Sequence, residues 1–312
     1  MAIGKRKAKI IQKRAYKRAI DGVLLFDKPP GPSSNDALQK VRTLFRAEKA
    51  GHTGSLDPLA SGLLPICFGE ATKLSTHLLD GDKGYRVTAR LGQRTDTLDA
   101  DGKLLLELPV PDLDEAAIEV ALAAFRGEIT QVPPMFSALK SGGKPLYELA
   151  REGIEIEREP RAVTIAKLIL VAWEPPLLTL DVDCSTGTYI RTLVDDLGQS
   201  FGCGAHVQAL RRTWAAPFRD PQMLTLTELE CLAWDTDLLD RLLLPMEAAT
   251  AELPRADLSN EEVVRFRGGH AISIMAREPA AIVAAYDCSG ALLGIARCEG
   301  GDWLKPYRVL NR

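Results

Sequence analysis

One acidic residue, Asp57, stands among glycines, hydroxyl-bearing and small apolar residues in Gly51-His52-Thr53-Gly54-Ser55-Leu56-Asp57-Pro58-Leu59-Ala60-Ser61-Gly62. Pro58 biases Asp57 toward extended backbone and away from helix. Gly51 and Gly54 allow the chain to turn sharply or to approach a ligand closely. Taken alone, the stretch fits two interpretations: a rigid loop that presents one carboxylate, or a common turn in which Asp57 caps a nearby amide.

Length and composition indicate a globular protein with enough apolar residues for a large core. The chain has 312 residues, of which 46% are hydrophobic and 26% charged, and two domains are expected. No apolar run is long enough to cross a membrane, and none follows the basic N-terminus as in a secretory signal. The six cysteines are scattered and do not cluster with the four histidines. We therefore expect a cytoplasmic protein without a zinc site or a disulfide framework.

Apolar periodicity around the Asp57 stretch predicts an α+β fold. The expected strands cover residues 22–26, 85–91, 161–172, 177–184 and 205–213, and the expected helices cover 34–46, 71–79, 114–125 and 188–199. Ser34 or Asn35 is the expected N-cap of the first helix. Because strands outnumber helices and come in neighbouring pairs, a mixed, largely antiparallel sheet fits better than a doubly wound one.

Three further segments set the expected domain organisation. Residues 21–250 form one large domain, in which the polar segment 133–161 is too long for a simple connection and predicts a functional flap. Residues 251–312 are expected to form a separate small domain, with a helix at 259–266 and strands at 281–286, 292–297 and 303–309. Residues 1–20 contain eight lysines and arginines and no acid, which predicts a basic, flexible arm.

An ordered set of motifs extends the Asp57 stretch over about residues 21–250. The motifs are Asp27–Ser34, Gly51–Lys73, Lys83–Val87, Arg94–Thr97, Ser137–Lys140, Gly187–Arg191 and Leu210–Arg212. Together they resemble the TruB family of pseudouridine synthases. This resemblance implies that the segment 133–161 clamps RNA and that residues 251–312 form a small β-rich RNA-binding module of the PUA type, although this last stretch has no sharp motif of its own.

The implied reaction converts uridine 55 in the T arm of tRNA into pseudouridine. It breaks an N-glycosidic bond, turns the base and rejoins it through carbon 5, which in principle needs no cofactor and no metal. By resemblance, Asp57 is the carboxylate that carries the reaction. It can act as a nucleophile, or as the base that removes a sugar proton to give a glycal, and the sequence leaves both routes open.

The resemblance also assigns two catalytic partners to Asp57. Arg191 is expected to hold the carboxylate ionised and oriented, since an adjacent guanidinium favours the charged form. The alternative for Arg191 is a surface arginine on a helix. Tyr85 is expected to stack its ring on the flipped target base. From alternation alone, Tyr85 belongs to the core.

Four more residues are expected to bind substrate. His52 is expected to help replace the extruded base, with a solvated turn residue as the alternative. Lys28 is expected to contact phosphate or to shape the field of the active site, with a plain surface lysine as the alternative. Tyr189 is expected to form a second wall of the pocket or to be a buried structural tyrosine. Leu210 is expected to pack in the pocket wall.

The overall charge of −3 is a poor fit to an RNA-binding protein and needs a local explanation. With +8 on residues 1–20, the rest of the chain carries −11. Phosphate contact depends on local patches, so we expect a narrow basic groove with strong salt sensitivity. The arm either contacts RNA or is a solvated tail, and Arg211 and Arg212 either meet phosphate or form solvated ion pairs.

The expected partner is the T-arm stem-loop of tRNA, bound by a monomer without a guide RNA and without a membrane. One alternative is a guide-RNA-dependent pseudouridine synthase with protein partners. Another is an RNA-binding factor that assists tRNA folding without chemistry, and both activities can coexist in one protein. Retention of Asp57, Tyr85 and Arg191 argues against a purely non-catalytic protein.

Overall fold

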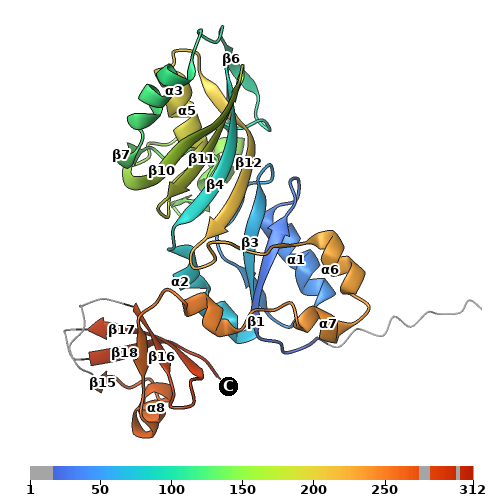
Figure 1. Ribbon diagram of the computed structural model, residues 1–312, viewed down its shortest axis with the longest axis vertical. Helices are drawn as coiled ribbons and strands as arrows, with labels where there is room; N and C mark the ends of the chain where they lie inside the picture. The colour runs from blue at the N-terminus through green and yellow to red at the C-terminus, as the bar shows by residue number, and fades with distance from the viewer. Residues whose placement is uncertain (1–16, 274–281, 300–302, 312) are drawn as a thin grey trace, which may run out of the picture.

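A nine-stranded sheet forms the centre of the protein, in a computed structural model that describes residues 17–273, 282–299 and 303–311 (Figure 1). Its strands run in the order β13 (Leu224–Thr225), β1 (Gly22–Lys28), β3 (Ser61–Phe68), β12 (Ala205–Ala215), β4 (Lys83–Leu91), β11 (Leu177–Cys184), β10 (Arg161–Glu174) and β7 (Gly127–Gln131), and β2 (Ala50–His52) pairs with β3. The pairs β1–β13 and β3–β12 are parallel and the others are antiparallel. The predicted mixed, largely antiparallel sheet is confirmed.

Alternation along β4 explains how the sheet meets its core. Tyr85, Val87 and Ala89 are buried, whereas Arg86 between them is exposed. Antiparallel pairing sets Val87 opposite Leu180 of β11 and Leu210 of β12. Apolar side chains of these three strands therefore join one core, which α5 covers at the upper end of the sheet (Figure 1).

In the described residues, the helices cover the five predicted segments with shifted ends and four further segments that were not predicted. They are α1 (Ser34–Leu44), the 3-10 helix η1 (Gly69–Leu74), α2 (Ser75–Leu79), α3 (Glu115–Ala123), α4 (Leu146–Arg151), α5 (Ile190–Ser200), α6 (Leu226–Leu232), α7 (Thr236–Asp240), the 3-10 helix η2 (Met246–Thr250) and α8 (Asn260–Arg267). None of those in the described ranges has the length and apolar character needed to cross a membrane.

The N-cap of α1 is Ser33, so the predicted cap at Ser34 or Asn35 is wrong. Ser33 Oγ accepts the Asp36 amide, while the Ser34 side chain turns away to another part of the chain. The helix at 188–199 begins two residues later than predicted, at Ile190, because Tyr189 keeps an extended backbone as its N-cap. The predicted helix 71–79 is split into η1 and α2.

A smaller sheet of five strands lies at the lower end of the molecule (Figure 1). Its order is β14 (Arg255–Asp257), β16 (Ile282–Tyr286), β17 (Leu292–Glu299), β18 (Trp303–Val309) and β15 (Ile272–Ser273). Residue 281, included in one predicted strand, lies outside the described residues. Lys73 of η1 donates to the Val309 carbonyl at 2.9 Å, and the Asn311 amide donates to Glu70 at 2.6 Å. These contacts join the small sheet to the large one, while the domain boundary at 250/251 stays a prediction.

Two segments near the large sheet complete the fold. The predicted flap contains β8 (Lys140–Ser141), β9 (Lys144–Pro145) and α4, and the hairpin of β5 (Gln93–Thr95) and β6 (Leu104–Glu107) forms a separate pair. Residues 1–16 of the predicted basic arm lie outside the described residues. Arg18 was predicted to belong to the flexible arm, but it is bound to the folded domain. Its guanidinium pairs with Asp240, and its amide donates to the Arg46 carbonyl.

Candidate active site

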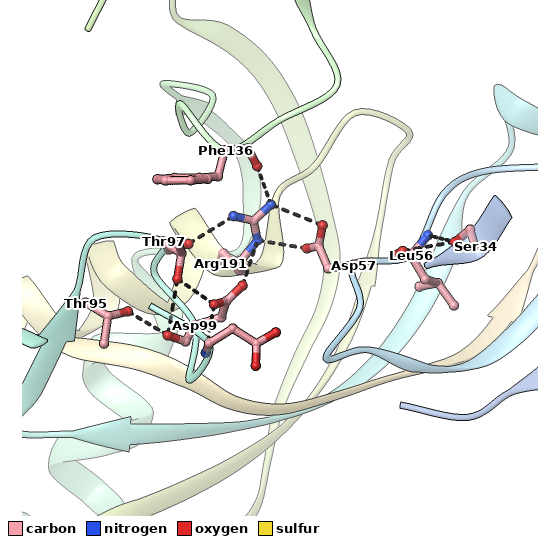
Figure 2. Close-up of polar contacts among 9 residues, drawn as sticks. Ser34, Leu56, Asp57, Thr95, Thr97, Asp99, Phe136 and Arg191 are labelled. Atoms are coloured by element: carbon pink, nitrogen blue, oxygen red, sulfur yellow. Dashed lines mark hydrogen bonds and ion pairs between the residues drawn. The ribbon is translucent and has the colours of Figure 1, made fainter. Parts of the chain in front are cut away.

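The Asp57 loop connects β2 to β3 and is fixed by hydrogen bonds from α1. Ser34, which is 4% exposed, accepts the Leu56 amide at 2.7 Å and donates to the Leu56 carbonyl at 2.9 Å (Figure 2). Because Ser34 satisfies both backbone groups of Leu56, the residue before Asp57 is tied to the start of α1. Sequence reasoning missed this role because a serine at the start of a helix was taken for its cap.

Glycine is required where the loop meets β12. Gly54 has φ +80°, and a Cβ there would lie 3.3 Å from Nη1 of Arg212. Gly62 has φ +97°, and a Cβ there would collide with the Arg212 carbonyl oxygen. Both positions therefore need the left-handed backbone and the missing side chain of glycine. The glycines of the motif let the Asp57 loop lie directly against β12.

Arg191 holds the Asp57 carboxylate from the first turn of α5. Its Nε donates to Asp57 Oδ2 at 2.8 Å and its Nη2 to Oδ1 at 3.4 Å (Figure 2). The remaining donors reach the carbonyl oxygens of Thr97 at 2.9 Å and Phe136 at 2.8 Å. Arg191 is 5% exposed, so the alternative of a surface helix arginine is wrong. The guanidinium joins three segments around one carboxylate.

Asp99 is a second carboxylate at Arg191 that sequence reasoning missed. It is 6% exposed, and its Oδ2 lies 3.8 Å from Arg191 Nε. Thr97 donates its hydroxyl to Asp99 Oδ1 at 2.5 Å, which orients the carboxylate (Figure 2). The signal in the sequence was weak, because Asp99 follows the Arg94–Thr97 motif in a stretch that resembles an ordinary turn.

The charges around Asp57 act on its pKa in opposite directions. Burial raises the pKa of Asp57 above its ordinary value, and the negative charge of Asp99 adds to this rise. The guanidinium of Arg191 opposes burial most strongly, and the ammonium of Lys28 helps. The Asp57 side chain still keeps 41% of its surface exposed, so its carboxylate faces open space in the site.

Five of the predicted site residues line one pocket of about 210 Å³. Its wall is formed by Ser55, Leu56, Asp57, Tyr85, Ser137, Ala138, Thr188, Tyr189, Ile190, Arg191 and Leu210. The pocket thus combines one carboxylate and one guanidinium with aromatic and aliphatic walls. In the described part of the chain, no three His, Cys, Asp or Glu side chains come together as a metal site requires.

Tyr85 and Tyr189 form the aromatic part of this wall. Tyr85 is 9% exposed, and burial raises the pKa of its hydroxyl. Tyr189 is fixed by Gln131, which accepts the Tyr189 amide at 3.0 Å and donates to the Tyr189 carbonyl at 3.3 Å. The Arg161 guanidinium lies over the Tyr189 ring, 4.7 Å from its centre. The Tyr189 ring is therefore held by a cation and its backbone by an amide, whereas Tyr85 is held by burial.

Lys28 and His52, the other two predicted site residues, do not line the pocket. Lys28 is fully buried under the Asp57 loop, which rules out a plain surface lysine. Its ammonium donates to the carbonyl oxygens of Pro29 at 3.0 Å, Pro58 at 3.3 Å and Ala60 at 2.7 Å. Burial lowers the pKa of Lys28 to about 8, while Asp57 opposes this shift.

His52 lies on β2, half-buried, with its Nδ1 buried and without a hydrogen-bond partner. Burial lowers the pKa of His52, and the charge of Arg212 adds to this effect. A lowered pKa favours the neutral imidazole near pH 7. The side chain is therefore neither a solvated turn residue nor part of the pocket wall.

Family profiles match most of the chain that carries this site. The profile of the TruB family pseudouridylate synthase N-terminal domain matches residues 42–190, and that of the tRNA pseudouridylate synthase B C-terminal domain matches residues 191–251. A tRNA pseudouridine synthase B from Sodalis glossinidius is 50% identical over 94% of this chain and 96% of its own length. The chain belongs to the TruB family. Another relative of that name, from Haemophilus influenzae, is 58% identical over 78% of this chain and 79% of its own length.

Solved structures agree with the fold of this TruB family member. A chain of a Cbf5-Nop10-Gar1 complex superposes with a TM-score of 0.72 at 26% identity, covering 89% of this chain and 78% of that one. A chain of an H/ACA RNP bound to a substrate RNA containing 2′-deoxyuridine gives a TM-score of 0.73 at 23% identity, with coverages of 93% and 85%. At this second identity the likeness concerns the fold alone.

Proposed function

We propose that this protein converts uridine 55 in the T arm of tRNA into pseudouridine, without a guide RNA, and that it also assists tRNA folding. The relatives of about 50% identity carry the name tRNA pseudouridine synthase B, which supports tRNA as the substrate. The observation that carries the proposal is the Asp57 carboxylate, bound by Arg191 at 2.8 Å and lining a pocket with Tyr85. This arrangement presents one oriented anion beside an aromatic wall.

The chemistry requires one bond to break and one to form. The N1–C1′ bond of uridine breaks, the detached uracil turns, and C5 forms a new bond to C1′. The C5 proton leaves to solvent and N1 takes up a proton, so that no redox change occurs. Asp57 either attacks C1′ or removes a proton from the sugar, and in both routes it must be ionised at the start.

The pocket must also accept a base that is normally stacked in folded RNA. Extruding the base costs a few kcal/mol, roughly, which contacts in the pocket must offset. Tyr85 supplies an aromatic face on which uracil can stack and turn, with Tyr189 and Leu210 as further walls. Arg191 keeps Asp57 in place while the base moves, because its other donors are held by backbone carbonyls.

Tritium release from carbon-5-labelled uridine tests the proposal. The wild-type protein is incubated with an unmodified tRNA transcript and with an isolated T-arm hairpin, each also prepared with cytidine at position 55. We expect release from both RNAs that carry uridine 55 and none from the substituted RNAs. Release that requires an added guide RNA, or that maps to another uridine, would reject the proposed specificity. Release from none of the RNAs would reject the enzymatic function.

A further inference from the structure

Arg212 lies beneath the Asp57 loop and is 1% exposed. It belongs to β12, where it pairs with Gly62 of β3 on one side and with Tyr85 of β4 on the other. Leu210, two residues earlier on the same face of β12, lines the pocket. The two alternatives raised from the sequence, phosphate contact and a solvated ion pair, are both wrong, because the Arg212 side chain is buried.

The Arg212 guanidinium is bound by neutral oxygens. Its Nε donates to the Leu63 carbonyl at 2.6 Å, and its Nη2 donates to the Gly54 carbonyl at 2.9 Å. Within residues 17–273, 282–299 and 303–311, no carboxylate lies at ion-pair distance from it. A buried charge is normally paired with an opposite charge, so this site keeps a positive charge that the folded protein does not neutralise.

We infer that Arg212 is a positioning residue for the reaction: it fixes the Asp57 loop beside Tyr85, and its unneutralised charge favours the negative charge that develops on the departing base. The inference rests on the proposed function, since only glycosidic cleavage creates that anion. When the N1–C1′ bond breaks, uracil leaves with the bonding electron pair. A cation fixed in advance in a site shielded from water stabilises such charge more than solvent does.

Arg212 lies between two parts of the site. Its bond to the Gly54 carbonyl holds the loop that presents Asp57, and it is paired with Tyr85 of β4, which lines the pocket. Arg86 offers a contrast in the adjacent strand. It is exposed on the other face of β4, and Asp181 neutralises it through hydrogen bonds of 2.8 and 2.9 Å. Arg86 is therefore a matched control for loss of an arginine from the same sheet.

The test compares wild type, Arg212→Met, Arg212→Lys and Arg86→Met under single-turnover conditions with saturating protein. For Arg212→Met we expect conversion about 100-fold slower with RNA affinity changed less than about threefold. Arg212→Lys keeps the charge but loses the fork, so it should recover part of the rate and be about 10-fold slower. Arg86→Met should match wild type. A rate for Arg212→Met within about threefold of wild type would overturn the inference.

A second RNA separates the charge effect from a structural one. It carries 5-fluorouridine at position 55, where C5 keeps its fluorine on bonding to C1′ and the N1=C6 bond takes up water instead of C5 losing a proton. The reaction is therefore followed as loss of 5-fluorouridine, by chromatography of the digested nucleosides. Fluorine makes the departing base a weaker base, so it needs less stabilisation. We expect the defect of Arg212→Met to shrink at least about fivefold on this RNA. Equal defects on both RNAs would overturn the electrostatic part of the inference, because a structural role slows both alike.

If circular dichroism shows that Arg212→Met does not fold, Arg212→Gln, which also removes the charge but can still donate to a carbonyl, takes its place, with the same comparison between the two RNAs and the same opposing outcome. If the wild-type protein converts neither RNA, the proposed function fails and this inference fails with it. If wild type converts uridine 55 but the Arg212 variants do so equally well, the inference fails alone.

Discussion

The cations on the two sides of the Asp57 loop have different binding partners. On the pocket side, Arg191 meets two carboxylates, Asp57 at 2.8 Å and Asp99 at 3.8 Å. Beneath the loop, Lys28 and Arg212 are buried and bind carbonyl oxygens of the loop and its neighbours. The first arrangement orients an anion, and the second anchors a backbone and adds positive charge. The loop is therefore held by cations on both sides, and only the cation on the pocket side, Arg191, is paired with carboxylates.

The largest effect, after loss of Asp57 itself, is expected on the neutralised side for Arg191→Lys. Lysine keeps the charge but cannot reach Asp57 and the carbonyls of Thr97 and Phe136 together. We expect single-turnover conversion to fall about 10²–10³-fold. Rapid-quench tritium release measures this rate, with Arg86→Lys as the control. A loss smaller than about threefold would show that charge alone, without the fork, suffices.

A smaller loss is expected for Asp99→Asn. Asparagine keeps the shape but removes the second negative charge at Arg191, so the guanidinium is held less firmly. We expect conversion to fall about 10–100-fold with little change in RNA affinity. The same assay applies, and Asp101→Asn is the control, because the Asp101 side chain is exposed and only its amide contacts Asp99. Equal rates in the two variants would show that the Asp99 charge does not contribute to the reaction.

The smallest expected effect is the loss of rate at alkaline pH, which is one half of a pH dependence that involves both sides of the loop. The pKa of Asp57 is raised by burial, so protonation should stop the reaction as pH falls, beginning above the ordinary range of aspartate. The pKa of Lys28 is lowered to about 8 by burial, so the ammonium loses its proton as pH rises through about 8. We expect single-turnover rates to fall at both limits, by a few-fold, roughly, on the alkaline side.

The sign of the Lys28 contribution to stability distinguishes loss of activity at alkaline pH from unfolding. The folded pKa of Lys28 is about 8 against an ordinary value of 10.5. Between these values the unfolded chain binds more protons, so this group's contribution to stability rises with pH. Loss of activity above pH 8 without loss of circular dichroism would therefore point to Lys28. Lys28→Arg stays charged. If its single-turnover rate falls above pH 8 as in the wild type, the assignment to Lys28 is wrong.

Part of the fold could be predicted because five strands of the large sheet carry a local pattern, whereas β2, β3, β7 and β13 were not predicted. Alternation in β4 and the paired apolar runs of β10 and β11 are visible in the chain, and the predicted strands fall where the structure has them. Helix ends were less certain. The N-cap at Ser33 and the late start of α5 after Tyr189 both depend on contacts with distant segments, the Asp57 loop and Gln131, which no local pattern contains.

The site could be predicted only in part, for a related reason. Asp57, Tyr85, Tyr189, Arg191 and Leu210 were named from motifs, and the structure brings them into one pocket. The burial of Lys28 and Arg212 could not be read from the sequence, because lysine and arginine usually lie at the surface. Asp99 escaped notice because its partner lies 92 residues away in the chain. Tertiary packing, not residue type, decides which charges meet.

Whether the Asp57 carboxylate carries the reaction is decided by single-turnover tritium release from uridine 55 by wild type and by Asp57→Asn, measured together with the RNA affinity of each. Asparagine keeps the size of the side chain and its contact with Arg191 but removes the anion. The account predicts that release falls at least about a thousandfold while affinity changes less than about threefold. Release by Asp57→Asn within about tenfold of wild type would contradict the claim that this carboxylate carries the reaction.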